Sequence, residues 1–174
     1  DPDINVGLEY RPPWIDRRQY VDIWVIQGDA ETAIELKYKT KKMGISLAGE
    51  QFALQNQAAQ DLARYDFVKD IERLERVVTA RRQVAGYAII LTNDSTYWSP
   101  PRKSDSVDSN FRIQEGRVLS GLLGWGPGAS EGTRRSRTDS IQLANSYQLA
   151  WRDYSNVGDL KDMKFRYAIV QVSN

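Results

Sequence analysis

The sequence contains no cysteine and no histidine. The absence of cysteine excludes disulfide bonds and thiolate zinc sites. The absence of histidine excludes Ser-His-Asp catalysis, imidazole acid–base chemistry and histidine metal sites. Any catalysis must therefore use carboxylates, lysine, arginine, tyrosine, serine or threonine. Any metal site must use oxygen ligands, which suit Mg²⁺, Mn²⁺ or Ca²⁺.

Long apolar runs are also missing. No stretch approaches the roughly 18 residues that a membrane span requires, and no basic-then-apolar leader opens the chain. We therefore expect a cytoplasmic protein with no membrane partner. A length of 174 residues fits a single domain, 1–174, with a substantial core. The net charge of +1 does not by itself demand a nucleic-acid partner.

Two segments near the N-terminus have the pattern of a β-hairpin. Residues 20–26, YVDIWVI, are β-branched and aromatic, and the five residues QGDAE that follow favour a turn. Residues 32–40, TAIELKYKT, alternate strictly between apolar and polar. This alternation predicts that Leu36 faces the core, while Glu35 and Lys37 share the polar face.

The middle of the chain predicts two helices and a buried strand. Glu50–Ala63 lacks glycine and proline and is rich in glutamine and alanine, which favours a helix. A second helix is predicted over Asp66–Val84, with Asp66 as its N-cap. Its apolar stripe comprises Phe67, Ile71, Leu74 and Val78. The apolar run at 86–92, GYAIILT, is typical of a central strand, and we expect Ile34, Leu36, Ile89, Ile90 and Leu91 to be mostly buried.

The C-terminal half is rich in loops. Residues 93–111 and the glycine-rich segment 121–132 have turn composition. Parity along 141–151 favours a pair of strands over a helix, and 165–172 is predicted to be the closing strand. The expected fold class is α/β: a mixed central sheet flanked by helices, with a loop-rich C-terminal insertion.

The residues that suggest chemistry lie on the predicted hairpin. Asp22 lies on the first strand, and Glu35-Leu36-Lys37 lies 35 − 22 = 13 positions later on the second. Two carboxylates and the Leu36 carbonyl could bind a hard divalent cation, which polarises a phosphodiester. Lys37 could orient a water molecule or stabilise the charge that develops on phosphate.

At these residues the sequence resembles the PD-(D/E)XK, or restriction-endonuclease-like, nuclease superfamily. The resemblance covers residues 9–92, although Val21 stands where the family name has proline. It implies a restriction-endonuclease-like sheet, catalytic roles for Asp22, Glu35 and Lys37, and hydrolysis of nucleic acid, DNA in preference to RNA. It also implies Mg²⁺ as cofactor, with Mn²⁺ expected to substitute. A homodimer is compatible with this hypothesis.

Further residues have weaker support. The resemblance suggests Glu9 as an additional metal-binding acid and Gln57 and Gln60 as residues that support the site. Two basic clusters are expected to line one positive groove that contacts nucleic-acid phosphates: Lys39, Lys41 and Lys42, and Arg134, Arg135 and Arg137. The segment RYDFVKDIERLER could contribute Arg64 and Asp70, but its pattern favours an ordinary amphipathic helix.

Three interpretations remain open at this point. The first is a Mg²⁺-dependent endodeoxyribonuclease of a restriction, repair or mobile-element system. The second is a nucleic-acid-binding or scaffold module that keeps the fold without the activity, which the near-neutral charge favours slightly. The third is an unrelated α/β protein in which IELKYK is only an edge strand.

Overall fold

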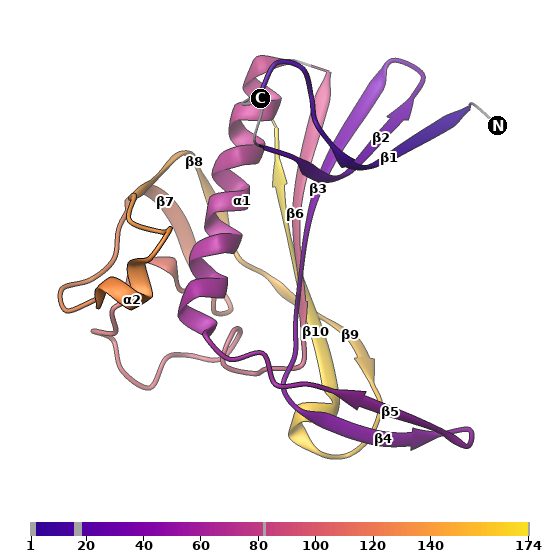
Figure 1. The fold of residues 1–174 in the computed structure, drawn as a ribbon, viewed down its shortest axis with the longest axis vertical. Coiled ribbons are helices and arrows are strands. Elements are labelled where there is room, and N and C mark those ends of the chain that lie inside the picture. The colour runs from indigo at the N-terminus through magenta and orange to yellow at the C-terminus, as the bar shows by residue number, and fades with distance from the viewer. Residues whose placement is uncertain (1–2, 16–18, 82, 174) are drawn as a thin grey trace.

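A computed structural model describes residues 3–15, 19–81 and 83–173 of the chain. Within these ranges the chain forms a large mixed sheet, two separate two-stranded sheets and a few helices, most of them short (Figure 1). The class is therefore mixed α/β, as predicted, although most of the ordered elements are strands. None of the described helices combines the length and the apolar composition needed to cross a membrane.

The large sheet has the strand order β1-β2-β3-β6-β10-β9. All neighbouring strands are antiparallel except β3 and β6, which are parallel. The bounds of its strands are β1 Ile4–Tyr10, β2 Val21–Gln27, β3 Ala30–Lys39, β6 Val84–Thr92, β9 Trp151–Asn156 and β10 Lys164–Val172. The predicted hairpin is confirmed as β2 and β3, but its turn is shorter than expected, because Gln27 pairs directly with Ala30 across Gly28 and Asp29.

Two smaller antiparallel strand pairs lie outside the large sheet. They are β4 Met43–Leu47 with β5 Glu50–Leu54, and β7 Val118–Leu123 with β8 Ile141–Gln148. The remaining short elements are η1 Ser109–Phe111, α2 Glu131–Arg134 and η2 Lys161–Met163. The predicted helix over Glu50–Ala63 is wrong for most of its length: Glu50–Leu54 forms β5, residues 55–59 form a loop, and only the last four residues belong to a helix. The Ala48-Gly49 turn, with both φ angles positive, closes a hairpin there, and pairing with β4 overrides helix propensity.

The long helix α1, Gln60–Ala80, connects β3 to its parallel neighbour β6 and lies against one face of the sheet (Figure 1). The predicted stripe is confirmed: Phe67, Ile71, Leu74 and Val78 are all buried. The predicted bounds are wrong, since the helix begins six residues before Asp66, which is therefore not its N-cap. The C-terminal strands are confirmed at 141–148 and 151–156, but β8 pairs with β7, whereas β9 joins β10 in the large sheet.

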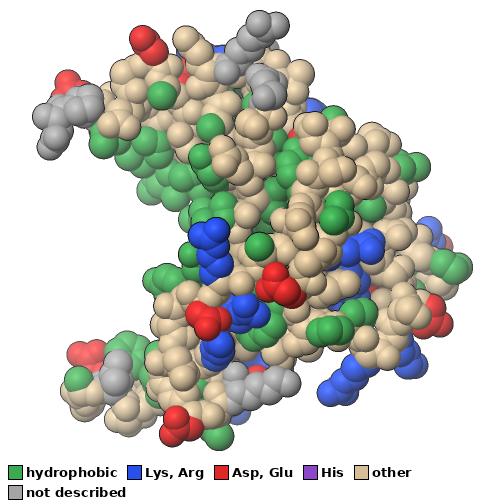
Figure 2. Space-filling view, turned by 180° about the vertical axis from the view of Figure 1, so that it is seen from behind, with side chains coloured by type: hydrophobic (Ala, Val, Ile, Leu, Met, Phe, Trp, Pro, Cys, Tyr) green, Lys and Arg blue, Asp and Glu red, His purple; other side chains and the backbone are tan. Residues whose placement is uncertain are grey.

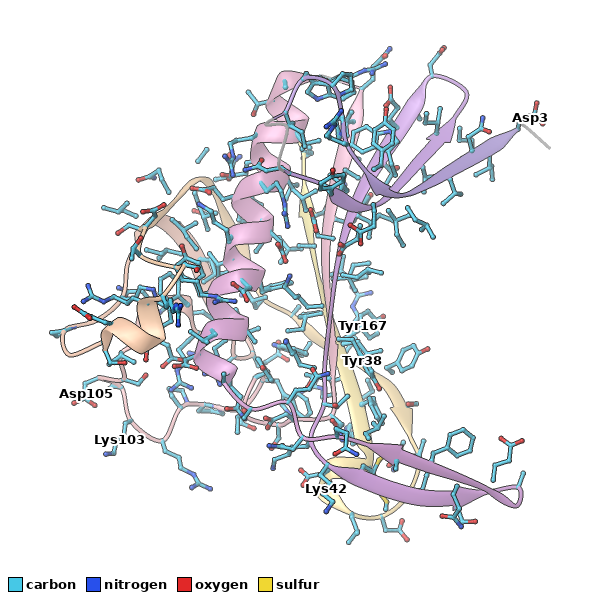
Figure 3. The ribbon with its side chains drawn as sticks, in the orientation of Figure 1. Asp3, Tyr38, Lys42, Lys103, Asp105 and Tyr167 are labelled. Atoms are coloured by element: carbon cyan, nitrogen blue, oxygen red, sulfur yellow. The ribbon has the colours of Figure 1, made fainter. Side chains whose placement is uncertain are left out.

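The faces of the sheet are the reverse of what the alternation suggested. Glu35 faces α1 and is only 2% exposed, whereas Leu36 on the opposite face is 44% exposed. Ile90 is buried as predicted, but the prediction for Leu36 is wrong, and Ile34, Ile89 and Leu91 are only partly buried. Tyr38 and Tyr167 extend from the same uncovered face (Figure 3).

The uncovered face is apolar. Hydrophobic side chains gather in a hollow between the arm that ends in β1 and the arm formed by β4 and β5 (Figure 2). Exposed members of this face are Val6, Leu8, Leu36, Tyr38, Tyr154 and Ile169. The helix therefore covers the face with the acidic residues and Ile90, and the other apolar residues expected in the core lie on the open face.

The contact between α1 and β6 can be tested at Gly86. A Cβ there would meet Leu74 Cβ at 3.2 Å, Val78 Cγ2 at 3.3 Å and Val172 Cβ at 3.3 Å. We expect Gly86→Ala to lower the free energy of unfolding by about 1–3 kcal/mol through overpacking, measured by urea denaturation. Gly44→Ala is the control, because its Cβ would meet nothing closer than Phe52 O at 4.0 Å. Equal stability of the two variants would show that α1 is not seated on Gly86.

Candidate active site

The three residues predicted to be catalytic, Asp22, Glu35 and Lys37, lie on the face of the sheet that α1 covers. Asp22 lies at the start of β2, and Glu35 and Lys37 lie in the second half of β3. Because Ile23 pairs with Ile34, the next positions, Asp22 and Glu35, stand opposite each other on the same side of the sheet. The register thus brings together the three residues that the sequence separates by up to 15 positions (37 − 22).

Asp22 is fixed by the backbone of the neighbouring strand. Its Oδ2 accepts a hydrogen bond of 2.7 Å from the backbone N–H of Leu36. Regular pairing between β2 and β3 stops at Ile23, so this N–H is satisfied by a carboxylate instead of a carbonyl. The contact places the Asp22 carboxylate beside Glu35 and leaves its second oxygen available for another partner.

Two residues of α1 complete the cluster. Lys37 Nζ lies 2.7 Å from Asp70 Oδ2, and Arg73 Nε lies 2.8 Å from Glu35 Oε1. Arg73 also forms an ion pair with Asp70 one turn before it. The cluster therefore alternates acid and base across the interface between sheet and helix, with three carboxylates and two cations.

Burial sets the electrostatics of Glu35. Loss of hydration raises its pKa to about 8; Arg73 and Lys37 oppose this shift, while Asp70 and Asp22 add to it. Burial also raises the pKa of Asp70, against the lowering effects of Lys37 and Arg73. Perturbed carboxylates of this kind are typical of functional sites, and structural ion-pair networks also produce them.

The donor set suits a hard cation. Glu35 Oε1 and Asp70 Oδ2 are buried at ion-pair distance from a cation but lack a hydrogen bond of good geometry. Asp22, Glu35 and the Leu36 carbonyl could supply oxygen ligands to Mg²⁺ or Mn²⁺. Within the described ranges, however, no three acidic side chains are arranged as a metal-binding group. Arg73 occupies the side of Glu35 that faces α1, so a metal would require this guanidinium to shift.

Asp70 and Arg73 are the residues that sequence reasoning undervalued. The sequence allows a role for Asp70 but favours an ordinary amphipathic helix at this segment, and it assigns no role to Arg73. Asp70 directly precedes Ile71 of the apolar stripe, and Arg73 follows it at the i, i+3 spacing of a helical ion pair. An acid at the edge of a buried stripe is the signal that could have identified both residues.

Of the three further residues proposed for the site, Glu9 lies beside Asp22 in the sheet and the two glutamines lie elsewhere. Glu9 is level with Asp22 in the register of β1 and β2, but it is exposed and has a positive φ of 47°. Gln57 lies in the loop before α1, where its backbone N–H donates to Thr40 O. Gln60 donates to Asp94 Oδ2 at 3.0 Å, ten residues along α1 from Asp70. Neither glutamine is placed to support the triad.

The two basic clusters predicted to line one positive groove lie on different sides of α1 (Figure 1). The segment after β3 that contains Lys41 and Lys42 lies on one side of α1, and α2 with Arg134 lies on the other (Figure 1). Lys39 is partly exposed, and Lys42 and Arg135 are exposed. Two members are already paired, Lys41 with Asp162 at 3.3 Å and Arg137 with Asp66 at 2.7 Å. The clusters are thus separate, and whether each contacts nucleic acid stays a prediction.

Comparisons of the chain with models of protein families, with curated proteins and with solved structures find no match. The geometry described above must therefore support any functional argument.

The raised pKa of Glu35 predicts a pH-dependent stability. Because the folded protein binds this proton more tightly than the unfolded chain, the stabilisation is complete below pH 4.5, the ordinary pKa, and is lost as the pH rises through about 8. Between pH 4.5 and about 8, the contribution of Glu35 to the free energy of unfolding should fall by up to about 1.4 kcal/mol for each pH unit.

Glu35→Gln should flatten this slope, as measured by urea denaturation at pH 5, 6, 7 and 8. Glu50→Gln, at the exposed start of β5, is the control and should keep the wild-type slope. A wild-type slope in Glu35→Gln would contradict a raised pKa at this position.

Proposed function

We propose that the chain is a metal-dependent nuclease of the PD-(D/E)XK type that hydrolyses phosphodiester bonds, DNA in preference to RNA. The observation that carries the proposal is the placement of Asp22, Glu35 and Lys37 on one side of the sheet by the pairing of β2 with β3. The fold adds support, because hairpin, helix and parallel strand follow one another in the order that the resemblance to this superfamily implies.

Each residue has a role that its surroundings favour. Asp22 and Glu35, with the Leu36 carbonyl, would hold Mg²⁺ or Mn²⁺. When bound, such a cation polarises a phosphodiester and activates water. Lys37, partly exposed and held by Asp70, would donate to a phosphate oxygen and stabilise the charge that develops there. Asp70 positions the ammonium group of Lys37, and Arg73 favours the ionised form of Glu35 that a metal would require.

A second candidate function is favoured by a specific observation. Arg73 and Lys37 already neutralise Glu35 and Asp70 within the protein. A binding or scaffold module would need no metal if these ion pairs serve only to join α1 to the sheet. The two candidate functions predict different results when the charge of Asp22 or Lys37 is removed without disturbing the packing. A nuclease would lose metal-dependent cleavage, whereas a scaffold has no cleavage to lose.

Substitution of Asp22 and Lys37 separates these two functions. Asp22→Asn keeps an oxygen that can accept from Leu36 N but loses the charge that binds metal. Lys37→Gln removes the ammonium group. We expect each variant to lower metal-dependent nicking of plasmid and single-stranded DNA by about 10²–10³-fold, with Mn²⁺ binding weakened in Asp22→Asn and largely retained in Lys37→Gln.

Lys69→Gln is the matched control, since Lys69 lies on the same helix and pairs with Glu72 outside the cluster. Thermal unfolding of every variant checks that the fold is retained. A wild-type protein that binds Mn²⁺ yet cuts no nucleic acid would favour the scaffold function. Cleavage that persists unchanged in both variants would place the active site elsewhere.

A further inference from the structure

A second polar site lies at the other end of α1. A cavity of about 650 Å³ opens between the first turn of the helix and the loop that runs from Ser95 to Arg112. Lys103 and Asp105 lie on this loop (Figure 3). The cavity is separate from the Glu35 cluster, because its helical residues precede Asp70 by six positions or more.

Arg64 is the central residue of this cavity. It is 4% exposed, yet it lines the cavity wall. One terminal nitrogen pairs with Asp108 at 2.5 Å, and the other donates to Thr96 O at 2.9 Å. Its Nε is buried without a hydrogen-bond partner. A buried guanidinium with an unused donor is costly unless something accepts from it.

A second arginine shares the same carboxylate. Arg112 lies 3.3 Å from Asp108 and donates to Ser106 Oγ at 3.0 Å, and its Nε is also buried without a hydrogen-bond partner. Burial and the nearby Arg64 lower the pKa of Arg112. One carboxylate therefore serves two guanidinium groups, which leaves positive charge in a poorly hydrated place.

The rest of the lining has the same character. Four cationic residues line the cavity, Arg64, Arg102, Lys103 and Arg112, against two acids, Asp61 and Asp108, a balance of 4 − 2 = +2. Four hydroxyl residues also line the cavity, Ser95, Thr96, Ser99 and Ser106, and the remaining lining residues are Gln60, Pro100, Pro101 and Val107. Guanidinium and hydroxyl donors around a net positive cavity are suited to an oxyanion with several acceptor oxygens.

We propose that this cavity binds a phosphate group, with Arg64 and Arg112 as its principal donors. The phosphate could be carried by a nucleic-acid strand or by a free nucleotide. The first source rests on the proposed function. Arg64 and Asp70 are six residues apart on α1, a rise of about 9 Å, or roughly three nucleotides of a strand at about 3.4 Å each.

The test measures binding with chelator present, so that cleavage plays no part. Inorganic phosphate and pyrophosphate are titrated into the full chain by calorimetry, against chloride at equal ionic strength. A fluorescent single-stranded 20-nucleotide DNA is titrated by anisotropy. The variants are Arg112→Gln, Arg64→Lys and the pair Arg102→Ala with Lys103→Ala. Arg76→Gln is the matched control, an exposed arginine on the same helix that pairs with Glu72.

We expect pyrophosphate to bind the wild type and the control alike, and Arg112→Gln to weaken binding about tenfold, as for the loss of one charge-assisted hydrogen bond. If DNA is the source, Arg112→Gln should also weaken DNA binding and lower its salt slope by about one. If only the small anions respond, the source is a free nucleotide.

Arg64→Lys and the Arg102/Lys103 pair keep the test valid if one variant fails to fold. Failure of the wild type to bind phosphate or pyrophosphate above the chloride control would overturn the proposal, as would equal affinities across the folded variants. If Lys37→Gln loses cleavage but still binds pyrophosphate, the phosphate-binding cavity is separate from the Glu35 cluster. If the wild type binds phosphate but cleaves no nucleic acid, the proposed nuclease function is refuted and the proposed phosphate site is not.

Discussion

The parallel pairing of β3 with β6 is the constraint on which the rest of the structure depends. Parallel neighbours cannot be joined by a tight turn, so the chain must cross over the sheet, and α1 makes that crossing. The helix then decides which face of β3 is covered. It covers the face with Glu31, Glu35 and Lys37, and each of these three charges is matched by a side chain from the helix or its end.

That matching is seen along the second half of the helix and just beyond its end. Arg73 meets Glu35, Asp70 meets Lys37, and Arg81 beyond the last turn meets Glu31, which also accepts from Trp24 Nε1 at 2.9 Å. Buried ion pairs of this kind add little net stability over well-packed apolar residues of the same size. Packing alone therefore does not account for acids under α1, and this is the physical reason for treating the Glu35 cluster as a site.

The sequence allowed the strands to be predicted more reliably than the faces they present. Alternation in TAIELKYKT identified β3, but a strand with apolar and polar sides does not say which side the helix will cover. Leu36 was assigned to the core by hydrophobicity, and the helix packs on Glu35 instead. The nearness of Asp22 to Glu35 followed from the hairpin and could be predicted. Their exact register could not, because it depends on the two-residue turn at Gly28-Asp29, which is shorter than the five residues expected. The contributions of Asp70 and Arg73 could not, because they depend on how α1 is rotated about its axis over the sheet.

The two charged regions of α1 differ in a way that bears on their chemistry. Around Glu35 the carboxylates outnumber the cations by three to two, and burial raises the pKa of the central acid. Around Arg64 the cations outnumber the acids, and two guanidinium groups share Asp108. A surplus of buried negative charge favours a proton or a metal ion, and a surplus of buried positive charge favours an oxyanion. Helix α1 carries residues of both regions and so fixes the distance between them. A metal-dependent enzyme that acts on a polyanion can use one region to bind the metal ion and the other to bind a phosphate group.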